Sequence, residues 1–209
     1  MKRLLVLAMA LFLLGGCTRS VVDVELSETK NDVPKIGKEV YIGPIVDRRV
    51  FEYKPRHPSI PSLQPGQDDT PGIRLRAIGR VRGGWGKARA DVLLNNGTVE
   101  TLTTDAVRQT FTELGYTVIT DKDQITEDTI VVEGTIDKFW TYMAMGFPAA
   151  TFHGSMATTL TVKPLKDGSI RTEVSAACSA RLSHVVNQTR DCSSRALQMY
   201  MEELKKNFE

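Results

Sequence analysis

Residues 151–182 read TFHGSMATTLTVKPLKDGSIRTEVSAACSARL and have the periodicity of two β-strands joined by a tight turn. Apolar side chains alternate along both halves, as in strands with one buried face. Residues 166–169, KDGS, carry the Asp-Gly pair that favours a hairpin turn. We therefore predict an antiparallel hairpin. Its inward positions are Phe152, Met156, Leu160, Val162, Val174, Ala176, Cys178 and Ala180.

The rest of the chain shows further strand patterns and two helix patterns. A helix is expected over 104–114, with Gly115 as its left-handed C-terminal residue. A second helix is expected over 191–207, capped by Asp191. This order predicts an α+β fold, with a largely antiparallel sheet and two main helices packed on one face. The other strands are expected at 40–47, 73–82, 90–94, 116–119 and 129–140.

The N-terminus has the composition of an export signal. Met1-Lys2-Arg3 precede an apolar run, residues 4–14, which is shorter than the roughly 20 residues of a membrane-spanning helix. Leu14-Gly15-Gly16-Cys17 resembles the lipobox of bacterial lipoproteins. This resemblance implies cleavage before Cys17, a diacylglycerol on its sulfur and a fatty acid such as palmitate on its new N-terminus. The alternative is an ordinary secretory signal with a chance cysteine.

Lipidation would hold the protein at a membrane. Each buried methylene contributes about 0.8 kcal/mol, so two or more acyl chains anchor a protein stably. In lipoproteins an Asp after the cysteine favours the inner membrane; Thr18 therefore favours the outer membrane, with the domain in the periplasm. We divide the chain into a signal (1–16), a lipidated polar tether (17–38) and a single domain (39–209). Within the domain, a proline-rich loop at 55–72 is expected to be partly disordered.

Charge is balanced overall and uneven locally. The chain has 27 basic and 25 acidic residues, and removal of Lys2 and Arg3 with the signal leaves 25 of each, which gives no support to nucleic-acid binding. Residues 73–90 contain no acid, and within them residues 73–82 predict a half-exposed strand with an arginine face. Since arginine grips phosphate and tryptophan favours interfaces, this basic segment predicts contact with anionic lipid, lipopolysaccharide or an acidic protein. The alternative is a solvated face paired with the chain's own acids. Its residues are Arg74, Arg76, Arg80, Arg82, Trp85, Lys87 and Arg89.

Two cysteines remain once Cys17 carries lipid. Cys178 and Cys192 are an even pair in an oxidising compartment, where a disulfide closing this loop would stabilise by roughly 3 kcal/mol. The alternative is a buried Cys178 thiol and an unrelated Cys192. No Cys-x-x-Cys or Cys/His spacing predicts a metal site, and we expect no cofactor.

No residue pattern predicts catalysis. His57, His153 and His184 are scattered, and none has the spacing of a catalytic triad. The acids of 121–128 lack the spacing and central glycine of a calcium loop, so we interpret them as a charged turn. Gly83–Gly86 lacks the ending of a phosphate-binding loop. We therefore predict a protein that is not an enzyme.

Several short motifs carry a resemblance to a known family. They are 43–49 (GPIVDRR), 78–79 (IG), 107–118 (VRQTFTELGYTV) and 131–139 (VVEGTIDKF). Together they resemble the YajG-like lipoproteins of Gram-negative bacteria, and the layout is similar to auxiliary lipoproteins of membrane-lipid ABC transport systems. These motifs mark strand ends, a helix and its exit, and no catalytic residue belongs to them.

Three functions follow as hypotheses. The first is a non-enzymatic, outer-membrane-anchored periplasmic lipoprotein that acts through protein or lipid contacts, held to the membrane by acylated Cys17. The second is an auxiliary subunit of a lipid ABC transporter, which predicts an apolar groove around Trp140 in the aromatic segment 139–148; core packing is the alternative for that segment. The third is an envelope hydrolase, which requires convergent polar residues that the sequence does not show.

Overall fold

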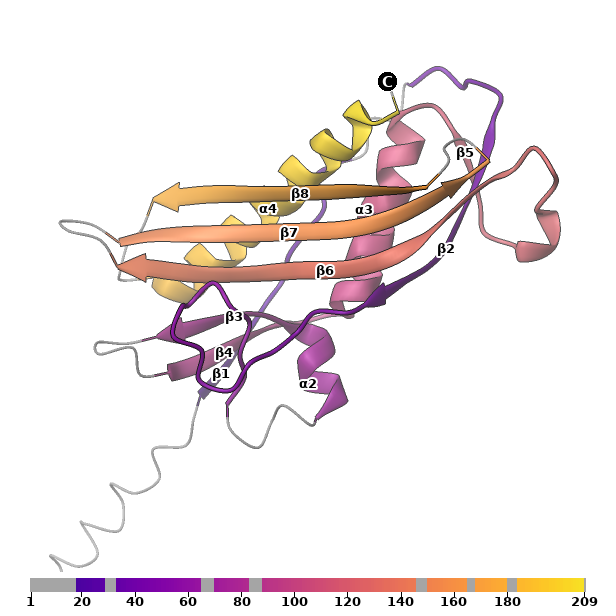
Figure 1. The fold of residues 1–209 in the computed structure, drawn as a ribbon. Helices are drawn as coiled ribbons and strands as arrows, with labels where there is room; N and C mark the ends of the chain where they lie inside the picture. The colour runs from indigo at the N-terminus through magenta and orange to yellow at the C-terminus, as the bar shows by residue number, and fades with distance from the viewer. Residues whose placement is uncertain are drawn as a thin grey trace, which may run out of the picture.

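The alternating residues of the predicted hairpin form two long neighbouring strands on one side of the sheet (Figure 1). β6 (Ile130–Met145) runs antiparallel to β7 (Ala150–Lys163), and β8 (Ser169–Ser179) pairs antiparallel with β7. Gly168 in the connecting turn has φ +88°, a conformation that glycine adopts readily. The predicted hairpin is confirmed. The computed structural model describes residues 18–28, 33–64, 70–82, 88–145, 150–164, 168–179 and 184–208.

The second edge of β6 pairs with two strands in succession. Its first half is parallel to β2 (Glu39–Asp47), and its second half is parallel to β3 (Ala77–Arg82). β2 pairs in parallel with β5 (Thr117–Ile119). β3 is antiparallel to β4 (Ala88–Leu94), which in turn is parallel to β1 (Thr18–Val22).

The sheet is therefore mixed, and the prediction of a largely antiparallel sheet is wrong. Local alternation reveals hairpins, where successive strands are antiparallel. The parallel pairs join strands far apart in the chain: β2 and β6, for example, are separated by two α-helices and three other strands. Nothing in a short window of sequence records such a pairing.

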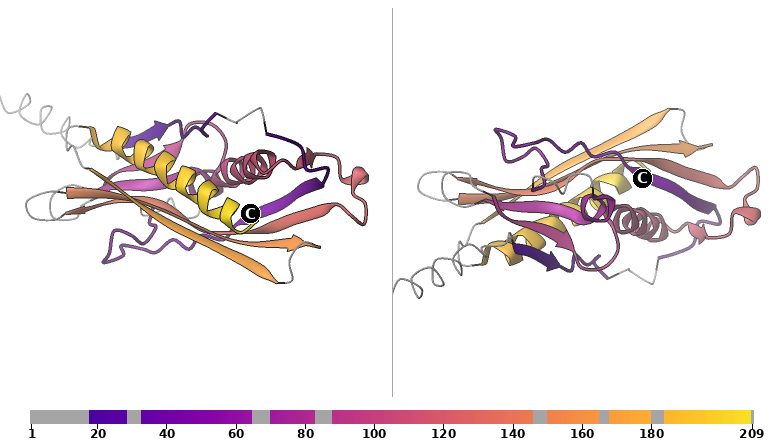
Figure 2. Two further views of the ribbon diagram at one scale, coloured as in Figure 1. Left: turned by 90° about the horizontal axis from the view of Figure 1, so that it is seen from above. Right: turned by 90° about the horizontal axis from the view of Figure 1, so that it is seen from below.

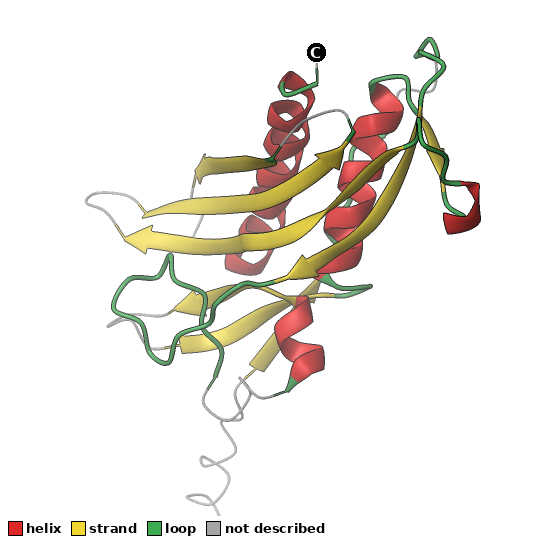
Figure 3. Ribbon diagram, turned by 45° about the vertical axis from the view of Figure 1, so that its right-hand side comes forward, coloured by secondary structure: helices red, strands yellow, loops and turns green. Residues whose placement is uncertain are grey.

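Two long helices pack against the sheet. α3 (Val99–Glu113) contacts β2 and β5, α4 (Val185–Lys206) contacts β7 and β8, and the helices contact each other (Figures 2 and 3). Their apolar faces bury a common core with the inward side of the strands. Its fully buried members include Val107, Phe111, Val132, Ile136, Leu160, Leu197, Tyr200 and Leu204.

Both helices begin earlier than predicted. Thr98 caps α3 and exchanges hydrogen bonds with Thr101 in a capping box, a role more often filled by Glu or Gln at the second position. α4 begins at Val185, more than one turn before the predicted cap Asp191. Val185 and Val186 also pack against the buried apolar clusters, which extends the helix toward its N-terminus. Gly115 has φ +87° after α3, as predicted.

The arginine-rich segment is not one strand. α2 (Pro71–Arg76) is a short helix that starts on a proline, which suits the first helical position, and β3 begins at Ala77. A 3₁₀ turn, η2 (Lys122–Gln124), lies in the charged connection between β5 and β6. The acids of this connection are exposed, as expected of a charged turn.

The segment predicted as a tether belongs to the fold. β1 pairs with β4 from Thr18 onward. Further along, the Gln109 side chain donates to the Ser27 carbonyl at 2.8 Å, and the Ile36 amide donates to the Gly115 carbonyl at 3.0 Å. The backbone groups of this polar stretch are thus satisfied by the sheet and by α3, so the tether prediction over 17–38 is wrong for the described residues.

The first part of the proline-rich loop packs on the outer face of the sheet, opposite the long helices (Figures 1 and 2). The Trp140 indole donates to the Pro58 carbonyl at 3.1 Å, and Leu63 is buried beside Trp140. These contacts hold residues 51–64 against the sheet as an outer-face loop. Residues 65–69 lie outside the described part of the chain.

Candidate functional site

Arg80, at the centre of the predicted basic segment, is buried and paired. Its side chain points to the outer face, where Nε lies 3.0 Å from Asp91 Oδ1. Nη1 donates to the Leu63 carbonyl at 2.6 Å, which joins the outer-face loop to β3. Removing both charges from water is costly, and the ion pair with Asp91 and the bond to Leu63 offset part of that cost. Arg80 therefore holds the fold together and is not open to a lipid headgroup.

Arg82 lies two residues further along β3 and is half-buried. Its Nη2 donates to the Ser62 hydroxyl at 3.2 Å. Burial, and next the charge of Arg80, lower the pKa of the Arg82 guanidinium. Arg82 thus keeps part of its surface open at the end of the strand.

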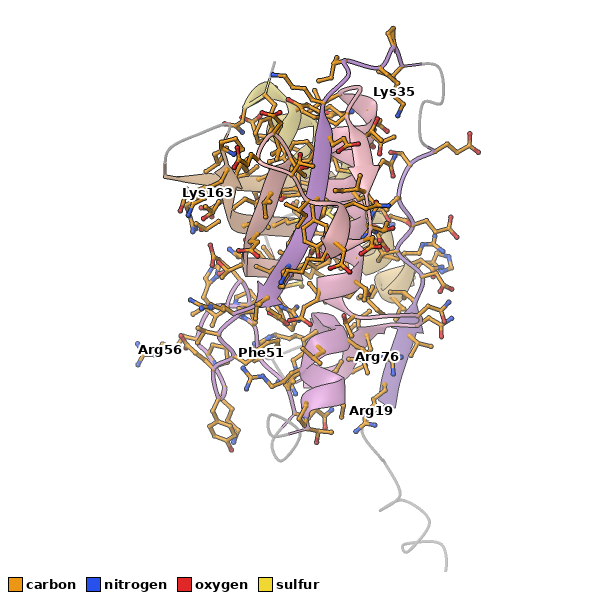
Figure 4. The ribbon with its side chains drawn as sticks, turned by 90° about the vertical axis from the view of Figure 1, so that its right-hand side faces the viewer. Arg19, Lys35, Phe51, Arg56, Arg76 and Lys163 are labelled. Atoms are coloured by element: carbon orange, nitrogen blue, oxygen red, sulfur yellow. A yellow bond between two sulfur atoms is a disulfide. The ribbon has the colours of Figure 1, made fainter. Side chains whose placement is uncertain are left out.

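The arginines of α2 have separate roles. Arg76 donates to the Leu94 carbonyl from Nε and Nη2, at 2.8 and 2.6 Å. Arg74 is exposed, and its guanidinium lies 5.2 Å from the centre of the Phe51 ring. Figure 4 shows Arg76 and Phe51 in the lower half of the molecule, below Lys163. The structure therefore does not gather the predicted arginines on one strand face. Trp85, Lys87 and the side chain of Arg89 lie outside the described residues.

Arg49 forms a buried network that the sequence analysis missed. Its guanidinium makes a bidentate pair with Asp47, with N–O distances of 2.8 and 2.7 Å. It also donates to the carbonyls of Ala77, Phe139 and Arg74, at 2.5, 3.1 and 2.8 Å. One side chain thus joins the end of β2 to α2, β3 and β6. The motif 43–49 contains both partners, and the adjacent Asp and Arg were the available signal.

Cys178 and Cys192 form a disulfide with a Cα–Cα distance of 5.9 Å. It links β8, at the edge of the sheet, to α4. The alternative of an unpaired Cys178 thiol does not describe this structure. Cys17, the predicted lipidation site, lies outside the described residues.

Three rings gather on the outer face. Tyr142 stacks on His153 at 5.1 Å between centroids and meets His57 edge-on at 6.0 Å. His57 Nδ1 lies 2.6 Å from the Ser59 hydroxyl, but among the described residues neither His57 nor His153 pairs with a carboxylate that would complete a triad. Nor do three or more described His, Cys, Asp or Glu side chains converge to hold a metal ion.

Trp140 does not line a groove. Its side chain is 1% exposed and packs with Leu63, Ala77 and Leu93 under the outer-face loop. The groove expected of a transporter subunit is therefore absent from Trp140, and core packing explains this part of the aromatic segment. Gly146 to Pro148 lie outside the described residues.

The surface hollows lie elsewhere. One of about 570 Å³ separates residues 25–27 from α4, where Asp191, Arg195 and Met201 line it. Another, of about 760 Å³, lies at the opposite end of the sheet from Met145, beside Lys38 and Pro164. Neither is lined by a residue of the predicted basic segment. No helix in the described chain has the length and apolar character needed to cross a membrane.

No family model and no curated protein matches the chain. Solved structures that resemble it include a Xanthomonas campestris protein described by the family model DUF330, with 11% identity over 90% of this chain and 92% of that chain and a TM-score of 0.48. A minor lipoprotein from Acinetobacter baumannii has 12% identity over 50% of this chain and 83% of that chain, with a TM-score of 0.33. A hypothetical protein from Chlamydia trachomatis has 8% identity, 82% and 95% coverage and a TM-score of 0.39. At these TM-scores none of the likenesses carries an argument about function.

Proposed function

We propose that this chain is a non-enzymatic lipoprotein of the bacterial cell envelope, anchored by acylated Cys17 and acting through protein or lipid contacts. The lipobox-like residues 14–17 supply the anchor. The described histidines and acids offer no converging catalytic set, which favours a role in binding over a role in hydrolysis.

The observation that carries the proposal is the start of β1. Thr18, directly after Cys17, is already paired with Ala90 of β4. The acylated residue is thus next to an ordered strand, and the lipid attaches to the folded domain itself. An anchor of several acyl chains at this position would hold the domain at the bilayer surface.

The membrane in question is the outer membrane. The residue after the cysteine is Thr18, whereas lipoproteins that are retained in the inner membrane tend to have Asp at this position. Thr18→Asp is therefore expected to shift the protein toward the inner-membrane fraction of a density gradient. An unchanged distribution would contradict the assignment to the outer membrane.

Metabolic labelling with a palmitate analogue tests the anchor. The native chain is expected to incorporate the label and to sediment with membranes. Cys17→Ser is expected to lose both properties, whereas Cys178→Ser with Cys192→Ser should keep the label because those sulfurs form the disulfide. A chain that carries no label, or that stays on membranes without Cys17, would overturn the proposal.

A further inference from the structure

A row of paired residues crosses the sheet and divides it into two ends. Each member is the register partner of the next, from β1 to β8. Thr189 of α4 lies at the same level, since its side chain approaches Gly79. The row consists of Ser20, Val92, Gly79, Thr141, Gly154 and Ala176.

On one side of this row, the ends of several strands lie at the same end of the sheet as the start of β1. Because β3 is parallel to β6 and antiparallel to β4, the last residues of β3 and β6 lie at the same end as the first residues of β1 and β4. The start of β7, the end of β8 and the first turn of α4 lie at this end of the sheet as well (Figure 1). We call this the anchor end. Its strand residues are 18–19, 80–82, 88–91, 142–145, 150–153 and 177–179.

The anchor end is depleted of carboxylates. Asp91 is the acid among its strand residues, and it is buried against Arg80. Arg19 is exposed, Arg82 is partly exposed, and Met145 has 72% of its surface exposed. The first turn of α4, residues 185–188, contains no acid either. The outer-face loop carries exposed Lys54 and Arg56 against one exposed acid, Glu52.

Apart from Asp91, the carboxylates of the described strands lie on the other side of the row. The charged connection between β5 and β6 lies at the same far end of the sheet. The far end is therefore the more acidic of the two, although Lys138, Lys163 and Arg171 also lie on its strands and the mature chain has equal numbers of acids and bases. The acids of the strands beyond the row are Glu39, Asp47, Glu133, Asp137 and Glu173.

We infer that the anchor end is a docking surface for the anionic phospholipid leaflet into which Cys17 inserts. This inference rests on the proposed lipidation. Lipid at Cys17 brings this end to the headgroups, where Arg19 and Arg82 meet phosphate and Met145 meets the apolar boundary. A carboxylate-rich end would be repelled there. The anchor then fixes which end of the domain faces the membrane, and the acidic far end points into the periplasm.

Single fluorescent probes test the orientation on the full-length acylated chain. Cys17 carries lipid and Cys178 is paired with Cys192, so an introduced cysteine is the free thiol. Met145→Cys marks the anchor end, and Lys163→Cys is the matched control, since the two positions lie at opposite ends of the β6–β7 ladder. Each variant is placed in vesicles of phosphatidylcholine and phosphatidylglycerol that carry a headgroup nitroxide quencher.

The inference predicts strong quenching of the probe at position 145 and little quenching at 163. Equal weak quenching of both probes on an acylated, vesicle-bound chain would overturn the docking surface and leave the anchor intact. Stronger quenching at 163 would overturn it as well and point to a protein partner for the anchor end. A chain without acyl label would overturn the proposed function, and the inference with it.

Charge variants test the chemistry. Arg19→Gln with Arg82→Gln should lower the docked-to-undocked ratio by about thirtyfold, because each basic residue near an anionic surface contributes about fivefold. The control, Arg108→Gln with Lys122→Gln, removes the same charge from half-buried Arg108 and exposed Lys122, both away from the anchor end, and should leave quenching at 145 unchanged. About 1 M salt, where the screening length is about 3 Å, should mimic the first variant. Equal effects of both variants would contradict recognition by the anchor end.

Discussion

At the scale of the residue, two buried arginines hold the outer face together. Arg49 satisfies three carbonyls and a carboxylate, and Arg80 pairs with Asp91 beneath the outer-face loop. A planar guanidinium with five donors suits such sites, where the single ammonium of lysine would leave acceptors without partners. Positive charge in this sequence is therefore partly structural, and composition alone overstates the basic surface.

Arg49→Ala should be strongly destabilising. It removes the guanidinium from Asp47, which keeps the backbone amide of residue 49, and from the carbonyls of Ala77 and Phe139, and breaking a buried pair costs about 3–5 kcal/mol. Urea unfolding measures the loss. The control is Arg171→Ala, which removes an exposed pair with Asp137 and should cost at most about 1 kcal/mol. Similar losses for the two variants would contradict the role given to Arg49.

Ionisation of buried Tyr200 should lower the free energy of unfolding at alkaline pH. Burial raises the pKa of its hydroxyl, which lies 2.8 Å from the Thr158 hydroxyl. The folded state holds this proton more tightly than the unfolded state, whose tyrosine titrates near pH 10, so stability is complete below about pH 10 and falls as the pH rises further. Urea unfolding between about pH 8 and 11 should show a steeper decline for the native chain than for Tyr200→Phe. Parallel declines would contradict this assignment.

At the scale of the element, α4 and β7 approach each other closely at one glycine. A Cβ on Gly154 would lie 2.4 Å from the Cys192 carbonyl oxygen, so the helix backbone or the strand must move. The disulfide from Cys178 ends at the same helical residue. Sequence alternation predicted β7 correctly. It could not explain Gly154, because the helix that requires a small residue there is distant in the chain.

Gly154→Ala and Gly72→Ala should change stability in opposite directions. The first forces a backbone shift in a packed site, at a cost of about 1–3 kcal/mol. The second adds a methyl in open space within α2, where alanine is favoured over glycine by about 1 kcal/mol. Thermal unfolding of the two variants beside the native chain measures both. A neutral Gly154→Ala would show that α4 does not press on β7 there.

The elements that sequence predicted are those with local signals. The hairpin of β7 and β8 and the inward face of α4 follow from alternation and helical spacing, and Gly115 from its place after an apolar helix. The parallel neighbours of β6 depend on partners far along the chain. The basic segment was misjudged for the same reason, since Asp91 lies on the next strand, one residue past the acid-free stretch.

At the scale of the whole molecule, the chain separates its charges along the strands and attaches its proposed lipid at the basic end. Strand direction produces this arrangement, because β3, β6, β7 and β8 bring acid-free ends to the side of the sheet where β1 starts. An outer-membrane lipoprotein with this design would present its acidic end to the periplasm. Its position on the membrane is then a property of the fold, independent of a flexible linker.

Neutron reflectometry of the acylated chain on a supported anionic bilayer tests this account most directly. β6 has 16 residues, which at about 3.3 Å each gives strands roughly 50 Å long. Docking by the anchor end predicts a protein layer about 50 Å thick that begins at the headgroups with no water-filled gap. A layer of about half that thickness, or one separated from the headgroups by a hydrated gap, would contradict it.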